Sequence, residues 1–340
     1  MIKNLQALRA FAALSVVFFH FSLVPAMSVP LHYGSFGVDL FFVLSGFIIA
    51  YSADRNSRHF LVHRLIRVLP PYWVATLLGF LMCLLGMKAL DAFGWFAQSL
   101  AFVTRADGRP PIIFVGWTLV YELAFYFLFA VLLRIWPRLA PLLCGVVLVF
   151  LAYGLQRTGL PLRPWPLLSE FAYGLLIFVV TKPLTAGGAV SRRLGAIPIA
   201  LTAIGLVGLY WFEPAILATS GVAAEMQRVV VLGVPAAMIV LGLVLIEKRG
   251  WSIGNRLVLA LGGASYAMYL LHPLVFAIVL GLKPGPLAVR LELFFGLAVV
   301  TVVLSLVYYW LVEVPSIRLL RRWLASDGPP VVQIPAEKSA

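Results

Sequence analysis

The chain has 340 residues, of which 62% are hydrophobic and 11% are charged, and its mean hydropathy is +1.02. These values exclude a soluble globular protein and indicate a polytopic membrane protein. The net charge of +13 does not point to nucleic acid, because the basic residues lie between apolar segments, where anionic lipid headgroups and a phosphorylated substrate are the expected partners. The two cysteines, Cys83 and Cys144, both lie in apolar segments, so no disulfide framework is expected.

Ten apolar segments follow one another along the chain. They are continuous rather than alternating with polar residues, which favours helices over a β-barrel. We therefore predict an all-α, polytopic integral membrane helical bundle of about ten transmembrane helices, at residues 5–24, 36–53, 71–87, 116–134, 138–155, 165–181, 197–212, 228–247, 257–280 and 289–312. Residues 93–103 are apolar but short, and they form either an interfacial or re-entrant piece or an eleventh span that would invert everything after it.

The basic residues predict the orientation of the bundle. With ten spans and the N-terminus inside, about two-thirds of the 26 lysines and arginines fall on the inner side. Both termini are therefore expected to be cytoplasmic. Residues 1–325 are predicted to form one transmembrane domain, and residues 326–340, which contain several prolines, are predicted to form a disordered cytoplasmic tail.

Arg9 and His20 lie inside the first apolar segment, where ionisable side chains are costly and usually functional. They are eleven positions apart, so a helix turns both to almost the same face, roughly 16 Å apart along its axis. The predicted orientation puts Arg9 toward the cytoplasm and His20 toward the opposite side. One helix would thus carry a fixed cation near one leaflet and a titratable base near the other.

Two acidic residues are predicted near the outer leaflet. Asp39 opens the second span at about the depth of His20, so its carboxylate could orient the imidazole, or it could simply be an acid placed favourably at a helix N-terminus. Glu122 lies early in the fourth span and needs a partner, for which His20 and Arg9 are candidates. A structural ion pair or a protonated acid is the alternative for Glu122.

The connection that leads into the third span is strongly basic. Arg64 and Arg67 lie on one face of a helical turn, and Pro70-Pro71 is expected to break that turn and begin the third span. Two guanidinium groups beside a new helix N-terminus form an anion site suited to phosphates. Ordinary positive-inside anchoring is the alternative, and Tyr72 with its neighbour Trp73 is then a simple interfacial aromatic pair.

Residues 265–273 form the last distinctive segment. Ser265, Tyr269 and His272 share a helix face, and Pro273 leaves the carbonyl of Tyr269 without its usual partner. The segment either lines the same cavity as His20 or is a kinked structural helix with a hydrogen-bonded histidine.

Several catalytic signatures are absent from the sequence: a Walker A motif, a dinucleotide-binding glycine fingerprint, a zinc cluster and a nucleophile elbow. His59 and His63 have the spacing of paired metal ligands, but no Glu follows His59 and the neighbouring arginines repel a cation, so no metal is expected. Energy or a reactive group must then come from a bound donor or from an ion gradient.

Taken in order, these motifs resemble the membrane-bound acyltransferase 3 family, and most closely its exopolysaccharide O-acetyltransferase-like branch. The matching motifs are Leu8-Arg9-Ala10 with His20, Gly37-Val38-Asp39-Leu40-Phe41-Phe42-Val43-Leu44-Ser45-Gly46, Arg64-x-x-Arg67 ahead of Pro71-Tyr72-Trp73, Trp117-Thr118-Leu119-x-x-Glu122, and Ser265-Tyr266-x-x-Tyr269-Leu270-x-His272-Pro273. The resemblance implies ten spans, a cytoplasmic acyl-CoA donor and acyl transfer to a sugar hydroxyl. It also implies that His20 is catalytic and that Arg9, Arg64 and Arg67 serve the donor. The extracytoplasmic hydrolase-like domain of larger members is lacking, so a single-step handover is expected.

We therefore predict an O-acyltransferase of the bacterial cytoplasmic (inner) membrane, which moves an acyl group, taken to be acetyl, from acyl-CoA to a sugar hydroxyl of an exopolysaccharide or its lipid-linked precursor. The expected partners are acyl-CoA, the saccharide acceptor and membrane lipids. The candidate site comprises His20, Asp39 and Glu122 as catalytic residues, Arg9, Arg64, Arg67 and Tyr72 as donor-binding residues, and Ser45, Trp117, Tyr266, Tyr269 and His272 as cavity-lining residues. Two alternatives stay open: a proton-coupled transporter or flippase for a glycan-related substrate, and a non-catalytic scaffold in a polysaccharide export complex.

Overall fold

The structure is a computed structural model that describes residues 2–29, 32–85, 88–103, 110–155, 165–184, 188, 193–219 and 222–326. Within these ranges every regular element is helical and there is no β-strand, which confirms the predicted all-α class. The predicted disordered tail lies outside the described residues, apart from Ser326, the last residue of α15.

The helices are α1 (Lys3–Ser22), α2 (Gly37–Arg55), α3 (Phe60–Cys83), α4 (Ala89–Leu100), α5 (Trp117–Ile135), α6 (Ala140–Leu155), α7 (Leu168–Thr181), α9 (Ile197–Leu217), α10 (Val222–Val231), α11 (Gly233–Lys248), α12 (Arg256–Gly263), α13 (Ser265–Ala277), α14 (Leu287–Tyr308) and α15 (Val314–Ser326). Short 3₁₀ turns lie at Pro25–Met27, Phe114–Gly116 and Trp165–Leu167, and a π-helical turn, η5 (Tyr309–Glu313), joins α14 to α15.

Among the described residues, seven helices are long and apolar enough to cross a membrane. The pair α12 and α13, bent by 66° at its break, can form one more span, and α6 and α7 are shorter apolar helices. Each of the ten predicted apolar segments overlaps one of these helices or helix pairs, although α6 and α7 do not reach the length of a full span. Helix α4 has 12 residues, or about 18 Å, which is too short for a hydrocarbon core of about 30 Å. It packs against α3, where the rings of Phe80 and Phe96 stack at 4.6 Å, so residues 93–103 do not form an eleventh span.

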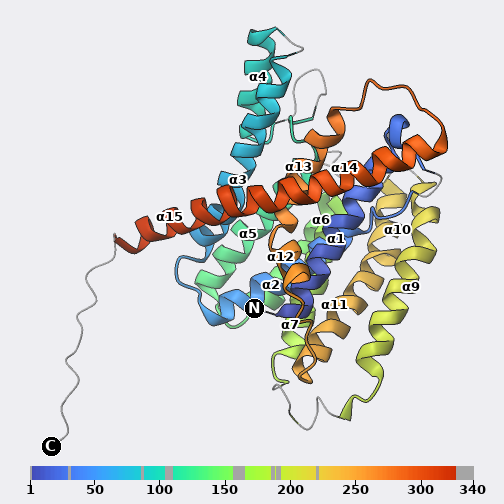
Figure 1. Ribbon diagram of the computed structural model, residues 1–340. Coiled ribbons are helices and arrows are strands. Elements are labelled where there is room, and N and C mark those ends of the chain that lie inside the picture. The colour runs from blue at the N-terminus through green and yellow to red at the C-terminus, as the bar shows by residue number, and fades with distance from the viewer. Residues whose placement is uncertain are drawn as a thin grey trace, which may run out of the picture.

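Helix α1 occupies the middle of the bundle. It packs against α2, α11, α12, α13 and α14 (Figure 1). The continuous helix formed by α14, η5 and α15 runs obliquely across the front of the bundle, while α3 and α4 extend together at its upper edge (Figure 1). Because α1 has helix neighbours on several sides, its ionisable residues face protein rather than lipid tails.

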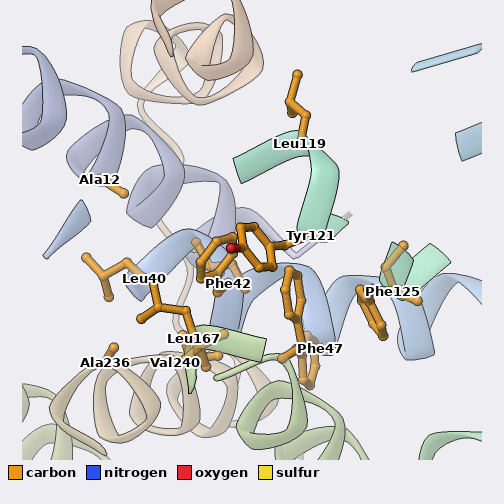
Figure 2. Packing of buried hydrophobic residues seen from close by; sticks show 14 of the residues in the cluster. Ala12, Leu40, Phe42, Phe47, Leu119, Tyr121, Phe125, Leu167, Ala236 and Val240 are labelled. Atoms are coloured by element: carbon orange, nitrogen blue, oxygen red, sulfur yellow. The ribbon is translucent and has the colours of Figure 1, made fainter. Parts of the chain in front are cut away.

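The core between α2, α5, α7 and α11 is filled mainly by aromatic and β-branched side chains. Figure 2 shows part of this core, in which Phe42 and Phe47 from α2 and Tyr121 and Phe125 from α5 point toward one another. Close packing of such side chains provides most of the attraction between helices in a membrane, where the hydrophobic effect is weak.

Helices α2 and α7 cross in direct backbone contact at two glycines. A Cβ atom at Gly174 would lie 2.1 Å from the carbonyl oxygen of Val43, and one at Gly46 would lie 2.1 Å from the carbonyl oxygen of Phe171. No side chain fits in such a space, so glycine at both positions is a condition of this crossing.

The N-terminus of α1 is held by the C-terminal end of α11. The carboxylate of Glu247 accepts hydrogen bonds from the backbone N–H groups of Lys3 and Asn4, at 2.8 and 2.7 Å. The side chain of Asn4 donates to the carbonyl of Trp251 at 2.9 Å and accepts from the N–H of Ile253 at 2.9 Å. These contacts satisfy two of the free backbone donors of the first turn and hold the N-terminal end of α1 against α11 and the segment after it.

Pro70 and Pro71 do not break the third helix, which corrects the prediction that the span begins there. Helix α3 runs without interruption from Phe60 to Cys83 and contains both prolines. The hydroxyls of Tyr266 and Tyr308, from α13 and α14, donate to the carbonyls of Val68 and Pro71, at 2.9 and 2.5 Å. Side chains of neighbouring helices thus contact the backbone on both sides of the proline pair. Arg64 and Arg67 consequently lie within the helix and not ahead of a new N-terminus.

Candidate active site

Two adjoining cavities enter the bundle from the end at which α1 begins. The outer cavity has a volume of about 640 Å³ and is lined by residues of α1, α2, α3 and α15. The inner cavity has a volume of about 100 Å³ and is lined by residues of α1, α2, α3, α5 and α13. Four residues line both cavities, namely Arg9, Ile48, Arg64 and Arg67, so three guanidinium groups surround the junction.

Arg9 and Arg64 are held at the junction by uncharged partners. Arg9 donates from Nε to the hydroxyl of Ser265 at 3.1 Å. Arg64 donates to the hydroxyl of Ser52, and its guanidinium lies 5.6 Å from the centre of the Phe60 ring. In the described ranges, no acidic side chain forms an ion pair with Arg9, Arg64 or Arg67. The three guanidinium groups outnumber the carboxylates of Glu122 and Glu313 that line the same cavities, so the junction carries net positive charge, which suits an anionic ligand.

Glu122 lines the inner cavity together with the three arginines. Its carboxylate accepts hydrogen bonds from the hydroxyl of Ser45 at 3.1 Å and from the hydroxyl of Tyr126. His20, one of the two candidate partners of Glu122, does not contact it in the described ranges. Of the two candidate partners, only Arg9 lines the same cavity.

Asp39 is fully buried and is paired with Arg228 of α10, not with His20. Arg228 donates from Nε and Nη2 to the two carboxylate oxygens, at 2.9 and 2.6 Å, and also to the carbonyl of Ser35 at 2.9 Å. This corrects the expectation that Asp39 orients the imidazole. Residue 228 is too distant in the sequence for the pairing to be inferred from local spacing.

His20 instead contacts His272 of α13. The Nδ1 atom of His20 lies 3.0 Å from the carbonyl oxygen of Val16 and 3.2 Å from Nε2 of His272. The two rings have centres 4.9 Å apart. His272 is fully buried, and its Nδ1 lies 3.0 Å from the carbonyl oxygen of Met268.

These contacts assign the tautomers of both rings. A carbonyl oxygen only accepts, so Nδ1 of His272 carries the hydrogen and Nε2 of His272 is an acceptor. Nδ1 of His20 then faces two acceptors, the Val16 carbonyl and His272, and must carry the hydrogen itself. The lone pair of neutral His20 is therefore on Nε2, which is the arrangement required of a general base.

Tyr269 separates the inner cavity from the histidine pair. Its ring lines the cavity and lies 6.0 Å from the ring of His272, and its hydroxyl is held by Thr118 at 2.8 Å and by the carbonyl of Val115 at 2.9 Å. His20 lines neither cavity and packs edge-on against Phe114 at 5.3 Å. The path from the arginines toward His20 thus ends one layer of side chains away from the imidazole.

The remaining predicted residues divide into two groups. Ser45, Tyr266 and Tyr269 line the inner cavity, whereas Trp117 and Tyr72 line neither cavity. The hydroxyl of Tyr72 donates to the carbonyl of Ser99 at 2.8 Å, and its buried ring stacks on Phe102, so it contacts α4 and the loop that follows. Trp117 packs against Phe42 and Tyr121. The sequence did not single out Ser52, Tyr126, Arg228, Arg318 and Arg321, since none belongs to a recognisable motif, and Thr118 was named only as part of the motif at Trp117.

No group of three His, Cys, Asp or Glu side chains that could hold a metal ion occurs in the part of the chain that the structure describes.

Comparison with known proteins decides the family. The family model of the acyltransferase 3 domain matches residues 2–310 of the chain. The chain belongs to the acyltransferase 3 family. It is therefore a multi-pass membrane acyltransferase, which agrees with its apolar helices.

Two relatives match the chain along most of their length. The chain is 29% identical over 308 residues to the exopolysaccharide production protein ExoZ of Rhizobium meliloti (strain 1021), covering 84% of this chain and 90% of the relative. It is 26% identical over 373 aligned positions to the acyltransferase MdmB of Streptomyces mycarofaciens. This match covers 94% of this chain and 93% of the relative. No solved structure matches the chain.

Proposed function

We propose that this acyltransferase moves an acetyl group from cytoplasmic acetyl-CoA to a sugar hydroxyl of an exopolysaccharide or of its lipid-linked precursor. The observation that carries the proposal is the set of three arginines at the junction of the cavities, with Arg9 on the same helix as His20. The name of the Rhizobium relative, an exopolysaccharide production protein, supports the acceptor class.

The shape and charge of the two cavities suit an acyl-CoA donor. The outer cavity is wide and basic, as the nucleotide of CoA requires, and the inner cavity is narrow and mostly apolar in lining, as its pantetheine arm requires. The phosphates that connect these two parts would lie at the junction, where Arg9, Arg64 and Arg67 form charge-assisted hydrogen bonds to them.

The reaction proposed at His20 needs no group beyond the two substrates. The Nε2 atom of His20 takes the proton of the acceptor hydroxyl as the oxygen attacks the thioester carbonyl. The carbon–sulfur bond then breaks, and the CoA thiolate leaves and takes the proton from His20, which restores the neutral imidazole. His272 accepts the Nδ1–H of His20 throughout and stabilises the transient imidazolium. Holding the donor and the acceptor together supplies much of the acceleration.

Substitution of His20 tests this proposal. In purified enzyme supplied with labelled acetyl-CoA and an unmodified polysaccharide, His20→Ala should lower transfer by about 10²–10⁴-fold, the usual contribution of a general base. His32→Ala is the matched control, because His32 is exposed and lies outside both cavities. Equal transfer by His20→Ala and the control would refute the catalytic assignment.

Substitution of the arginines tests the donor site separately. The double variant Arg64→Ala with Arg67→Ala should raise the KM for acetyl-CoA at least tenfold, because it removes two charged contacts to phosphate. An unchanged KM would show that these arginines do not bind the donor and would favour the alternative, that they only anchor the topology of the protein in the membrane. A carrier or flippase, the competing class, would release no free CoA from acetyl-CoA in detergent solution.

A further inference from the structure

A second group of basic residues lines the outer cavity, away from the junction. Arg318 and Arg321 project from α15, and His63 contributes from α3. None of these three residues lines the inner cavity. The positive charge of the outer cavity is therefore arranged in two places, at the junction and at the side formed by α15.

The geometry of the C-terminal helix explains why these two arginines face the cavity. Arg318 and Arg321 are three residues apart, so they lie on one face of α15, which packs against α3. The π-helical turn η5 precedes α15, and its i→i+5 hydrogen bonds change the direction in which later residues point. Arg322, the next residue, does not line the cavity.

The charge balance of the outer cavity calls for a ligand with several negative charges. Five arginines line it, three at the junction and two from α15. Glu313 is the only acidic residue among the described lining residues, and it is almost fully buried in η5. One phosphate group would leave most of this charge unused, whereas a ligand that has phosphates at two separate points would use both groups of arginines.

We propose that Arg318 and Arg321 form a second phosphate subsite, which holds the 3′-phosphate of the CoA nucleotide. This inference rests on the proposed function, because the diphosphate of CoA is assigned to the junction and its pantetheine arm to the inner cavity. The ribose and its 3′-phosphate then extend into the outer cavity, on the side that α15 lines. A phospholipid headgroup carries the same phosphate chemistry, and the test below separates the two sources.

The experiment compares two donors, acetyl-CoA and acetyl-dephospho-CoA, which lacks only the 3′-phosphate. The wild-type enzyme should show a KM about tenfold higher for acetyl-dephospho-CoA, because charged contacts to one phosphate are lost. The double variant Arg318→Ala with Arg321→Ala should raise the KM for acetyl-CoA by a similar factor and leave the KM for acetyl-dephospho-CoA unchanged. The kcat should stay the same for both donors, which also shows that the variant is folded.

Arg322→Ala provides the control, since it removes an arginine from the same helix without touching the cavity. It should behave as the wild type with both donors. Equal KM values of the wild-type enzyme for the two donors would overturn the subsite. The subsite would also be overturned if the double variant showed an equal rise in KM for both donors and anionic phospholipid reversed that rise. Such a result would assign the two arginines to lipid headgroups. Failure of the wild-type enzyme to use acetyl-CoA at all would instead refute the proposed function itself.

Discussion

His272 can be tested as the residue that positions His20, by two substitutions that differ in one property. His272→Leu replaces the fully buried ring with an apolar side chain of similar size and removes the acceptor that lies 3.2 Å from Nδ1 of His20. His272→Gln keeps an acceptor oxygen at about the position of Nε2. The Val16 carbonyl, at 3.0 Å, remains in both variants, so the tautomer of His20 is still favoured.

The expected effect follows from the bond that is lost. In the transition state His20 is an imidazolium, and a hydrogen bond to a charged group contributes about 1.5–3 kcal/mol. The kcat/KM of His272→Leu should therefore fall about 10- to 100-fold, which is less than the fall expected for His20→Ala. His272→Gln should recover most of this loss, because it again offers an acceptor to Nδ1.

The assay is acetyl transfer from labelled acetyl-CoA by purified protein, with the amount of folded enzyme measured by size-exclusion chromatography in detergent. Wild-type kcat/KM in His272→Leu would refute the positioning role. Equal losses in the leucine and glutamine variants would also refute it, since a role in packing alone does not distinguish an acceptor from its absence.

Three further predictions concern the fold around the site. Gly174→Val should abolish recovery of folded protein, because its Cβ would collide with a backbone carbonyl of α2. Gly94→Ala is the control, because a Cβ at this position meets nothing within 4 Å. Equal yields of the two variants would contradict the close crossing of α2 and α7. Arg228→Met should lower the free energy of unfolding in detergent by about 3–5 kcal/mol, because it leaves the buried carboxylate of Asp39 without its partner. Adding Asp39→Asn should restore most of that stability. No recovery in the double variant would argue against the ion pair. Tyr72→Phe should cost about 1 kcal/mol of stability and leave the KM for acetyl-CoA unchanged, whereas a raised KM would support donor binding.

The architecture was largely predictable because the bilayer imposes it. Each span must be about 20 apolar residues long and must satisfy its own backbone hydrogen bonds, so apolar length alone indicates where the helices lie. The short helix α4 and the uninterrupted α3 were harder to predict. Proline normally ends a helix, and the segment around Pro70 and Pro71 is contacted by the hydroxyls of Tyr266 and Tyr308, which come from distant parts of the chain.

The sequence predicted in general terms that Arg9, Arg64 and Arg67 face the interior of the bundle, where they meet at the junction of the two cavities. Arginines inside or beside apolar helices turn toward the protein interior, since lipid offers them no partner. Which acid or base each residue meets was not predictable. The partner of Asp39 is Arg228, 189 residues away, and the partner of His20 is His272, 252 residues away.

The sequence by itself determined the membrane class, the apolar segments and the residue types available for chemistry, because these depend on local composition and helical spacing. The tertiary structure alone decided the pairs: Asp39 with Arg228, His20 with His272, and Arg318 and Arg321 with the cavity that the junction arginines share. The physical reason is that a contact between two helices depends on how each is rotated and tilted against its neighbours. Those rotations result from packing over the whole bundle, including close crossings such as Gly46 with Gly174, and not from any one segment.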